Sequence, residues 1–195
     1  MMNILYEPFP NSITADGAKH EILTDFREWL RFADLIADAA VDAPTKLLLL
    51  TQWFIVPPPH LTADMVIGLF DFFHAKALEP DPLEQDENDV PQEPELPHPP
   101  VFDWKYDARF LLGDFLHFYG MNLLQVPYLH WWEFRSLFSA LPDDSMTAKR
   151  IGYRSADLSQ IKDPAQRARI ARIQKAIALP FEFDDEMIGA LLWNT

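Results

Sequence analysis

Residues 102–141 read FDWKYDARFLLGDFLHFYGMNLLQVPYLHWWEFRSLFSAL and hold three of the six tryptophans. This stretch predicts two amphipathic helices joined by a short connection. Asp103 is expected to cap the first helix, because a carboxylate there accepts the unpaired N–H groups of the first turn. An apolar stripe then recurs at three- and four-residue steps: Trp104, Ala108, Leu111, Phe115 and Phe118.

The same stretch contains residues that end one helix and begin the next. Gly120 stands where a left-handed C-cap residue is expected. Pro127 is placed to open the second helix, and Pro142 to stop it. One face of that second helix is predicted to be apolar, with Trp131, Phe134, Phe138 and Leu141.

Length and composition favour a globular protein. With 195 residues, 49% of them apolar, the chain can bury a core as a single domain. It has no cysteine, which excludes disulfides and thiol chemistry, and its formal charge of −14 opposes binding to nucleic acid or anionic lipid. Glu7 and Pro8 interrupt any signal peptide, and the longest apolar run, residues 47–56, is too short to span a bilayer.

The N-terminal part predicts a β-hairpin followed by helices. Residues 11–22 contain Asp16-Gly17, a dipeptide typical of a type I′ turn. In residues 24–78 we expect three helices, with Thr24 capping the first, Pro44 beginning the second and Thr62 capping the third.

The remaining segments differ sharply in charge. Residues 79–100 carry eight acidic residues, no Lys or Arg and many prolines, and predict a disordered acidic loop. Residues 101–154 form the predicted aromatic helical hairpin, with a short helix after Pro142. Residues 155–195 comprise a basic helix from Pro164 and an acidic, then apolar, tail. The predicted fold is therefore a mainly α-helical single domain, residues 1–195, with a small N-terminal β-hairpin.

Three carboxylate–histidine pairs have the i, i+3 spacing of helical di-iron sites: Asp114 with His117, His130 with Glu133, and Asp71 with His74. The lone glutamates that such a site also needs cannot be assigned, and acidic chains produce such pairs by chance. We therefore expect no metal and no cofactor. The chain has no G-x-S-x-G motif, P-loop or dinucleotide glycine pattern, so no catalytic residues are predicted.

Two surfaces are candidates for binding. The basic helix, residues 162–175, has two candidate partners: nucleic acid, or an acidic segment such as the tail at 182–186. The negative net charge of the chain favours the acidic segment. The adjacent Trp131 and Trp132 project about 100° apart on a helix, so one of them is a candidate for an interface.

The chain resembles a bacteriophage tail-assembly family called "gene product fifteen". The residues that carry the resemblance are FDWKYDARFLLGDFLHFYG, YLHWWEFRSLFSALPDD, IGYR and, near the N-terminus, EPFPNSI and ILTDFREWLRFADLI. The resemblance implies a non-enzymatic tail-assembly chaperone that acts in the host cell cytoplasm. Its partners would be the tape-measure protein and other tail-assembly proteins.

From the aromatic side chains of this stretch and the matching positions we predict six partner-binding residues: Trp104, Tyr106, Asp107, Trp131, Trp132 and Arg135. We expect no nucleic acid or membrane partner, and a homo-oligomer is left open. The alternatives are a structural virion or neck component and, more distantly, a carboxylate–histidine metalloenzyme.

Overall fold

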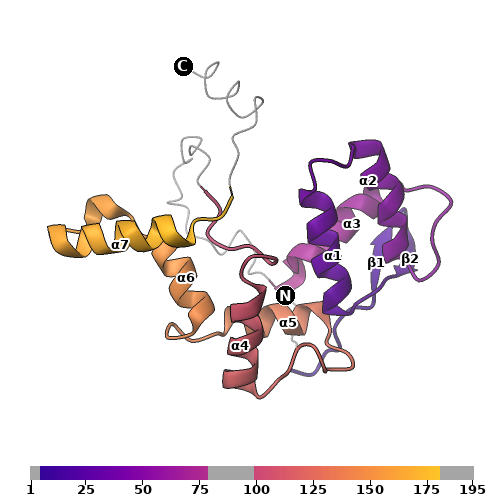
Figure 1. The fold of residues 1–195 in the computed structure, drawn as a ribbon. Helices are drawn as coiled ribbons and strands as arrows, with labels where there is room; N and C mark the ends of the chain where they lie inside the picture. The colour runs from indigo at the N-terminus through magenta and orange to yellow at the C-terminus, as the bar shows by residue number, and fades with distance from the viewer. Residues whose placement is uncertain (1–4, 79–98, 181–195) are drawn as a thin grey trace, which may run out of the picture. The chain divides into compact units, whose positions relative to one another are not determined.

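The computed structural model describes residues 5–78 and 99–180, and it is mainly helical with a small N-terminal hairpin, as predicted (Figure 1). Most of the expected acidic loop at 79–100 and the tail from 181 lie outside the described residues. The principal elements are β1 (Ser12–Ala15), β2 (Ala18–Glu21), α1 (Phe26–Ala37), α2 (Ala43–Leu50), α3 (Ala63–His74), α4 (Ala108–Tyr119), α5 (Trp131–Ser139), α6 (Met146–Ser155) and α7 (Pro164–Ile177). Short 3-10 helices are η1 (Thr51–Trp53), η2 (Lys76–Leu78) and η4 (Leu158–Gln160). Among the described helices, none has the length and apolarity needed to cross a membrane.

The predicted hairpin is confirmed. Strands β1 and β2 pair antiparallel, with Ala15 opposite Ala18. Asp16 and Gly17 between them have φ angles of 52° and 73°, as a type I′ turn requires. Helix α3 packs against β1, where Gly68 approaches Ile13 so closely that an added Cβ would lie 2.9 Å from the Ile13 Cδ1.

The N-cap of α1 is Asp25, so the prediction of Thr24 is wrong. The Asp25 carboxylate accepts the Arg27 backbone N–H at 3.0 Å. Thr24 cannot take this role, because its carbonyl accepts the Trp131 N–H at 2.8 Å in a ladder that also joins Phe26 to Leu129. Because residues 24–26 pair with residues 129–131, the helix begins one residue later than the sequence predicts.

The starts of three other helices follow the sequence. Pro44 lies in the first turn of α2, and the Thr62 hydroxyl accepts the Met65 N–H at the start of α3. Pro164 is the first residue of α7, whose N-cap, Asp163, accepts two backbone N–H groups. Proline and a short polar side chain act locally at a helix start, which explains why sequence alone located them.

The central stretch is helical, but both of its helices begin later than predicted. Asp103 caps only a turn, accepting the N–H groups of Lys105 and Tyr106 at 2.8 Å, and α4 begins at Ala108. Gly120 does end α4 in the left-handed region, with φ 64°. Pro127 lies before α5 in a bend, and the helix begins four residues later, at Trp131.

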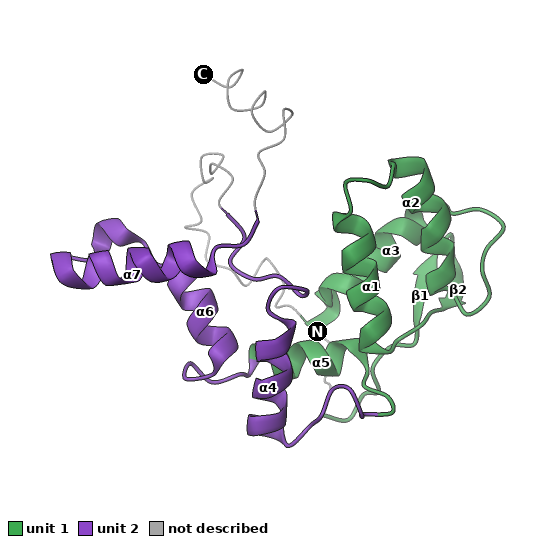
Figure 2. Ribbon diagram, in the orientation of Figure 1, with its two compact units in different colours: residues 1–88, 127–139 green, residues 89–126, 140–195 purple. Residues whose placement is uncertain are grey.

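The chain divides into two compact units (Figure 2). Unit 1 comprises residues 1–88 and 127–139 and contains β1, β2, α1–α3 and α5; unit 2 comprises residues 89–126 and 140–195 and contains α4, α6 and α7. The helices predicted as a hairpin, α4 and α5, thus belong to different units. Whether both units fold as one domain, as the length suggests, stays a prediction.

The two units are stabilised differently. Unit 1 has an aromatic core in which Trp29 and Phe32 are fully buried and Phe26 stacks on Phe134 with ring centroids 4.7 Å apart. In the described part of unit 2, the buried apolar residues are Leu111, Phe115 and Leu123, and the buried polar residues are Asp107, Asp114, Ser145 and Thr147. Contacts between buried polar side chains therefore contribute a larger share of the stabilisation in unit 2 than in unit 1.

Candidate protein-binding surface

Trp131 and Trp132, two of the predicted partner-binding residues, are core residues of unit 1. They are 1% and 3% exposed, so neither lies at an open surface, and a partner contact by one of them stays a prediction. The Trp131 ring stacks on Phe73 at 5.4 Å, and the Trp132 ring packs on Phe72 at 5.2 Å. Their burial does not support a direct contact with a partner.

These tryptophans and Arg135 cap the C-terminal end of α3. The Trp132 indole N–H donates to the Phe72 carbonyl, and the Trp131 indole N–H and the Arg135 guanidinium both donate to the Phe73 carbonyl, each at 2.8 Å. The last carbonyls of a helix lack the usual N–H partner four residues on, and the Phe72 carbonyl otherwise accepts only the Ala75 N–H at 3.1 Å. A cation near these carbonyls also interacts favourably with the helix dipole. The motif Trp-Trp-x-x-Arg therefore holds α5 on the end of α3.

His130 fixes the start of α5 to the N-terminal segment. Its Nδ1 accepts the Trp132 backbone N–H at 3.1 Å, so the proton resides on Nε2, which lies 3.0 Å from the Pro10 carbonyl. The ring stacks on Phe9 at 4.8 Å. Burial lowers the pKa of His130, and the hydrogen bond to Pro10 only partly opposes this effect.

Asp107, another predicted site residue, is the centre of a buried ion network in unit 2. Its carboxylate accepts from Arg150 Nε at 2.9 Å and from the guanidinium of Arg154. Burial alone would raise the pKa of Asp107, but the hydrogen bonds from Arg154 and Arg150 outweigh it and hold the pKa below 3.8. The Arg150 guanidinium also lies 4.2 Å from the centre of the Phe110 ring. This network joins α4 to α6.

The other two predicted residues lie in the turn before α4. The Trp104 ring packs edge-on against Phe102 at 4.7 Å, and Tyr106 is 54% exposed. Of the six predicted residues, all of which the structure describes, Tyr106 alone is classed as exposed. The structure brings Trp131, Trp132 and Arg135 together in unit 1, and Asp107 takes a separate structural role in unit 2.

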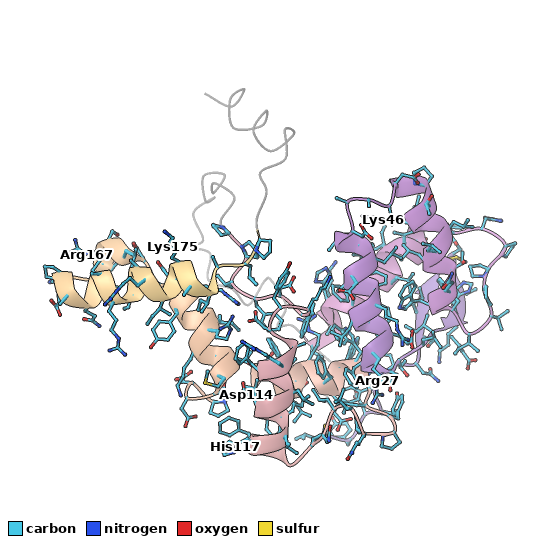
Figure 3. The ribbon with its side chains drawn as sticks, viewed as in Figure 1. Arg27, Lys46, Asp114, His117, Arg167 and Lys175 are labelled. Carbon is cyan, nitrogen blue, oxygen red and sulfur yellow. The ribbon has the colours of Figure 1, made fainter. Side chains whose placement is uncertain are left out.

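The carboxylate–histidine pairs have other partners. Asp114, on α4 (Figure 3), accepts the N–H groups of Met146 and Thr147 at 3.0 and 2.7 Å, which places a carboxylate at the N-terminus of α6. Both ring nitrogens of His130 are engaged, and Asp71 pairs with Lys76. Within residues 5–78 and 99–180, no group of three or more metal-binding side chains converges.

The residues that sequence analysis missed form an open apolar groove between α2 and α3 in unit 1. This α2–α3 groove has a volume of about 570 Å³. Its lining includes Leu47, Leu48, His60, Leu61, Val66 and Ile67. Leu47, Leu48 and Ile67 are 47%, 70% and 56% exposed.

A signal for this groove was present in the sequence. Residues 47–50 are four consecutive leucines, and successive residues on a helix point about 100° apart. Such a run cannot turn entirely toward one core, so some leucines must face outward or meet a partner. Leu50 is buried, and Leu47 and Leu48 are the ones left exposed.

Comparisons with known proteins give one family. A family model described as bacteriophage Gp15 protein matches residues 5–179 of this chain. No curated protein and no solved structure matches it. The matched range covers nearly all of the described residues of both units, including the α2–α3 groove and the Asp107 network.

Proposed function

Because the chain belongs to the bacteriophage Gp15 protein family, we propose that it acts in phage tail assembly as a chaperone for the tape-measure protein. It binds amphipathic helices of that protein and performs no chemical reaction. The observation that carries this proposal is the α2–α3 groove, three of whose lining apolar side chains, Leu47, Leu48 and Ile67, are exposed. Exposed apolar surface of this kind is typical of sites for protein partners.

The chemistry of the groove suits a helical occupant. An amphipathic helix binds a groove by inserting apolar side chains spaced at i, i+3 or i+4 and i+7. Leu48 and Ile67, 70% and 56% exposed, would become covered by such a helix. Full burial of a leucine or isoleucine side chain contributes roughly 1.5–3 kcal/mol, so a few such contacts support a reversible complex.

Charge supports the same proposal. The net charge of −14 keeps a protein with an exposed apolar groove soluble and disfavours nucleic acid. A long tape-measure helix that exposes apolar stripes before tail-tube subunits surround it would need such a partner. The proposed setting is therefore the host cell cytoplasm, where tails assemble, and the partners are the tape-measure protein and other tail-assembly proteins.

Co-expression with a fragment of the tape-measure protein tests the proposal. The soluble fraction of the fragment should rise with the wild-type protein and fall back with Leu48→Asp or Ile67→Asp, because a charge in the groove opposes apolar docking. Leu124→Asp is the matched control: Leu124 is 77% exposed but does not line the groove. Circular dichroism of each variant establishes that the fold is retained.

Two outcomes would overturn the proposal. Equal solubilisation by wild-type protein, Leu48→Asp and Ile67→Asp would show that the groove is not the binding surface. Stoichiometric amounts of the protein in purified virions, measured by mass spectrometry, would favour a structural tail or neck component, since an assembly chaperone leaves the finished particle.

A further inference from the structure

A second open groove lies wholly within unit 2, along one face of α7. This α7 groove has a volume of about 910 Å³. Its lining includes Val101, Ala156, Leu158, Ala171, Lys175 and Leu179. Residues 171, 174, 175 and 178 follow the i, i+3, i+4, i+7 pattern, so α7 presents a single face to the groove.

Side-chain hydrogen bonds hold the walls of this groove in place. Arg154 Nε donates to the Ile177 carbonyl at 2.8 Å, and its Nη1 donates to the Val101 carbonyl at 2.9 Å. Gln174 Nε2 donates to the Ala156 carbonyl at 2.8 Å. These hydrogen bonds therefore fix both walls of the groove within unit 2.

Helix α7 has apolar side chains that are only partly buried and positive charges that no described carboxylate pairs with. Within residues 5–78 and 99–180, α7 has no buried residue, and its isoleucines are only partly covered. It carries Arg167, Arg169, Arg172 and Lys175 and no acidic residue; Figure 3 shows Arg167 near its start and Lys175 near its end. In that same part of the chain, no carboxylate forms an ion pair with any of these four cations.

We propose that the α7 groove is the docking site for the protein's own segment 181–193. This segment begins directly after Pro180, next to Leu179 in the groove wall. It contains four acidic residues and no Lys or Arg, and then a run of apolar residues: Met187, Ile188, Leu191, Leu192 and Trp193. Acidic residues complement the cations of α7, and the apolar residues complement the groove.

The chain length allows this arrangement. The six residues 181–186 reach up to about 20 Å when extended, which is enough to reverse direction at the end of α7. Residues 187 and 188 can then lie beside the groove, while Glu182, Asp184, Asp185 and Glu186 remain near Lys175 and Arg172. Helix α7 itself is about 21 Å long, which is comparable to the roughly 23 Å that the seven residues 187–193 span when extended.

The other charges at the groove are compatible with an acidic occupant. Arg154 is already neutralised by Asp107. Asp157 lines the groove, but its carboxylate accepts the Ser159 N–H at the start of η4. Lys175 is thus the lining cation available to a carboxylate from outside the described residues.

The internal acidic segment suits the groove less well. Residues 79–98 carry eight carboxylates but only three large aliphatic residues, Leu83, Val90 and Leu96, scattered among prolines. They can approach the cations of α7 but supply no continuous apolar stripe for the groove. The 181–193 segment offers both, and this inference does not depend on the proposed chaperone function.

Site-directed crosslinking tests the inference, because the chain has no cysteine and introduced pairs react alone. The test pair is Ala171→Cys with Ile188→Cys, joined by a short bis-maleimide. The control pair is Ala176→Cys with Ile188→Cys, since Ala176 is exposed on α7 away from the groove lining. We expect the test pair to crosslink within one chain on the order of ten-fold faster, because docking raises the local concentration of the two thiols.

The charge contribution has its own readout. Lys175→Glu and high salt should each slow crosslinking of the test pair, because both weaken attraction to the acidic residues. Lys105→Glu, on an exposed residue outside the groove, should leave the rate unchanged. Unfolding curves of each variant establish that α7 is still folded.

Three outcomes would overturn the inference. Equal rates for the test and control pairs would show that the segment has no preferred face of α7. A crosslink that forms only between two chains would show that a second copy occupies the groove. Peptide mapping that finds residues 79–98 in the groove, with a photoreactive probe at Ala171→Cys, would assign it to the internal segment.

Discussion

Arg154 and Asp107 form a bidentate ion pair in the interior of unit 2: Nη1 lies 2.5 Å from Oδ2 and Nη2 lies 3.0 Å from Oδ1. The two side chains are 5% and 1% exposed. The same guanidinium donates to the carbonyls of Val101 and Ile177. One arginine thus ties the start of α4, the segment before it and the end of α7 to α6.

Asp107→Asn should destabilise unit 2 by about 3–5 kcal/mol, because it leaves the buried guanidinium of Arg154 without a counter-charge. Urea unfolding monitored by circular dichroism measures the change. Asp143→Asn, on an exposed residue, is the control and should shift stability by less than about 0.5 kcal/mol. A loss below about 1 kcal/mol for Asp107→Asn would contradict the assigned role of the ion pair.

The pairing also predicts an acid limit to stability. The pKa of Asp107 is below its usual 3.8 in the folded protein, so the unfolded state binds a proton more readily. The stabilisation is complete above about pH 4 and is lost as the pH falls through the lowered folded pKa. Wild-type protein should lose more stability than Asp107→Asn between pH 4 and pH 2, measured as the difference in urea midpoint.

Trp132→Phe should destabilise unit 1 by about 0.5–1.5 kcal/mol, because the Phe72 carbonyl at the end of α3 loses its indole donor and keeps only the Ala75 N–H. The ring remains apolar, so most of the packing survives. Tyr106→Phe is the control, since it removes a polar group from a residue that is 54% exposed. Equal stability of Trp132→Phe and wild type would show that the indole N–H is dispensable.

The lowered pKa of His130 predicts that the stability of the protein depends on pH near neutrality. Its pKa is lowered in the folded state from the ordinary value of 6.5, so the unfolded state binds more protons in the window below that value. Stability is therefore complete above about pH 6.5 and declines as the pH falls toward the lowered folded pKa. A second proton on the imidazole would bind Nδ1, which now accepts the Trp132 N–H, so protonation would also remove this hydrogen bond.

His130→Asn should flatten this part of the stability profile, because the amide can still accept a backbone N–H but does not titrate. Urea midpoints at pH 7.5 and 5.5 provide the comparison, with His60→Asn as a control on an exposed histidine. An unchanged slope in His130→Asn would assign the pH dependence to other groups.

Gly120 and Gly113 give opposite predictions for the same substitution in unit 2. Gly120 has φ 64°, and an added Cβ would meet no atom within 4 Å, so Gly120→Ala should cost about 1–2 kcal/mol from backbone strain alone. Gly113 lies inside α4 and is equally open, so Gly113→Ala should stabilise by up to about 1 kcal/mol. Thermal unfolding of both variants measures the sign, and like signs would contradict the assigned conformation of Gly120.

Features that depend on a few neighbouring residues were predictable from sequence. The Asp16-Gly17 turn, the cap by Thr62, the start of α7 at Pro164 and the C-cap at Gly120 all agree with the structure. Helix starts that depend on distant segments were not: Asp25 replaces Thr24, and α5 begins at Trp131 rather than Pro127. In both cases, residues 24–26 pair with residues 129–131, across more than a hundred residues of sequence.

The candidate site shows the same division more sharply. Local sequence determined that Trp131 and Trp132 share a helix, but only the tertiary structure decided that their indoles cap α3 and that Leu47 and Leu48 stay exposed. Turns and caps are set by the backbone preferences of adjacent residues, and these preferences can be read from the sequence directly. Burial depends instead on which distant surfaces meet, and periodicity within one helix does not contain that information.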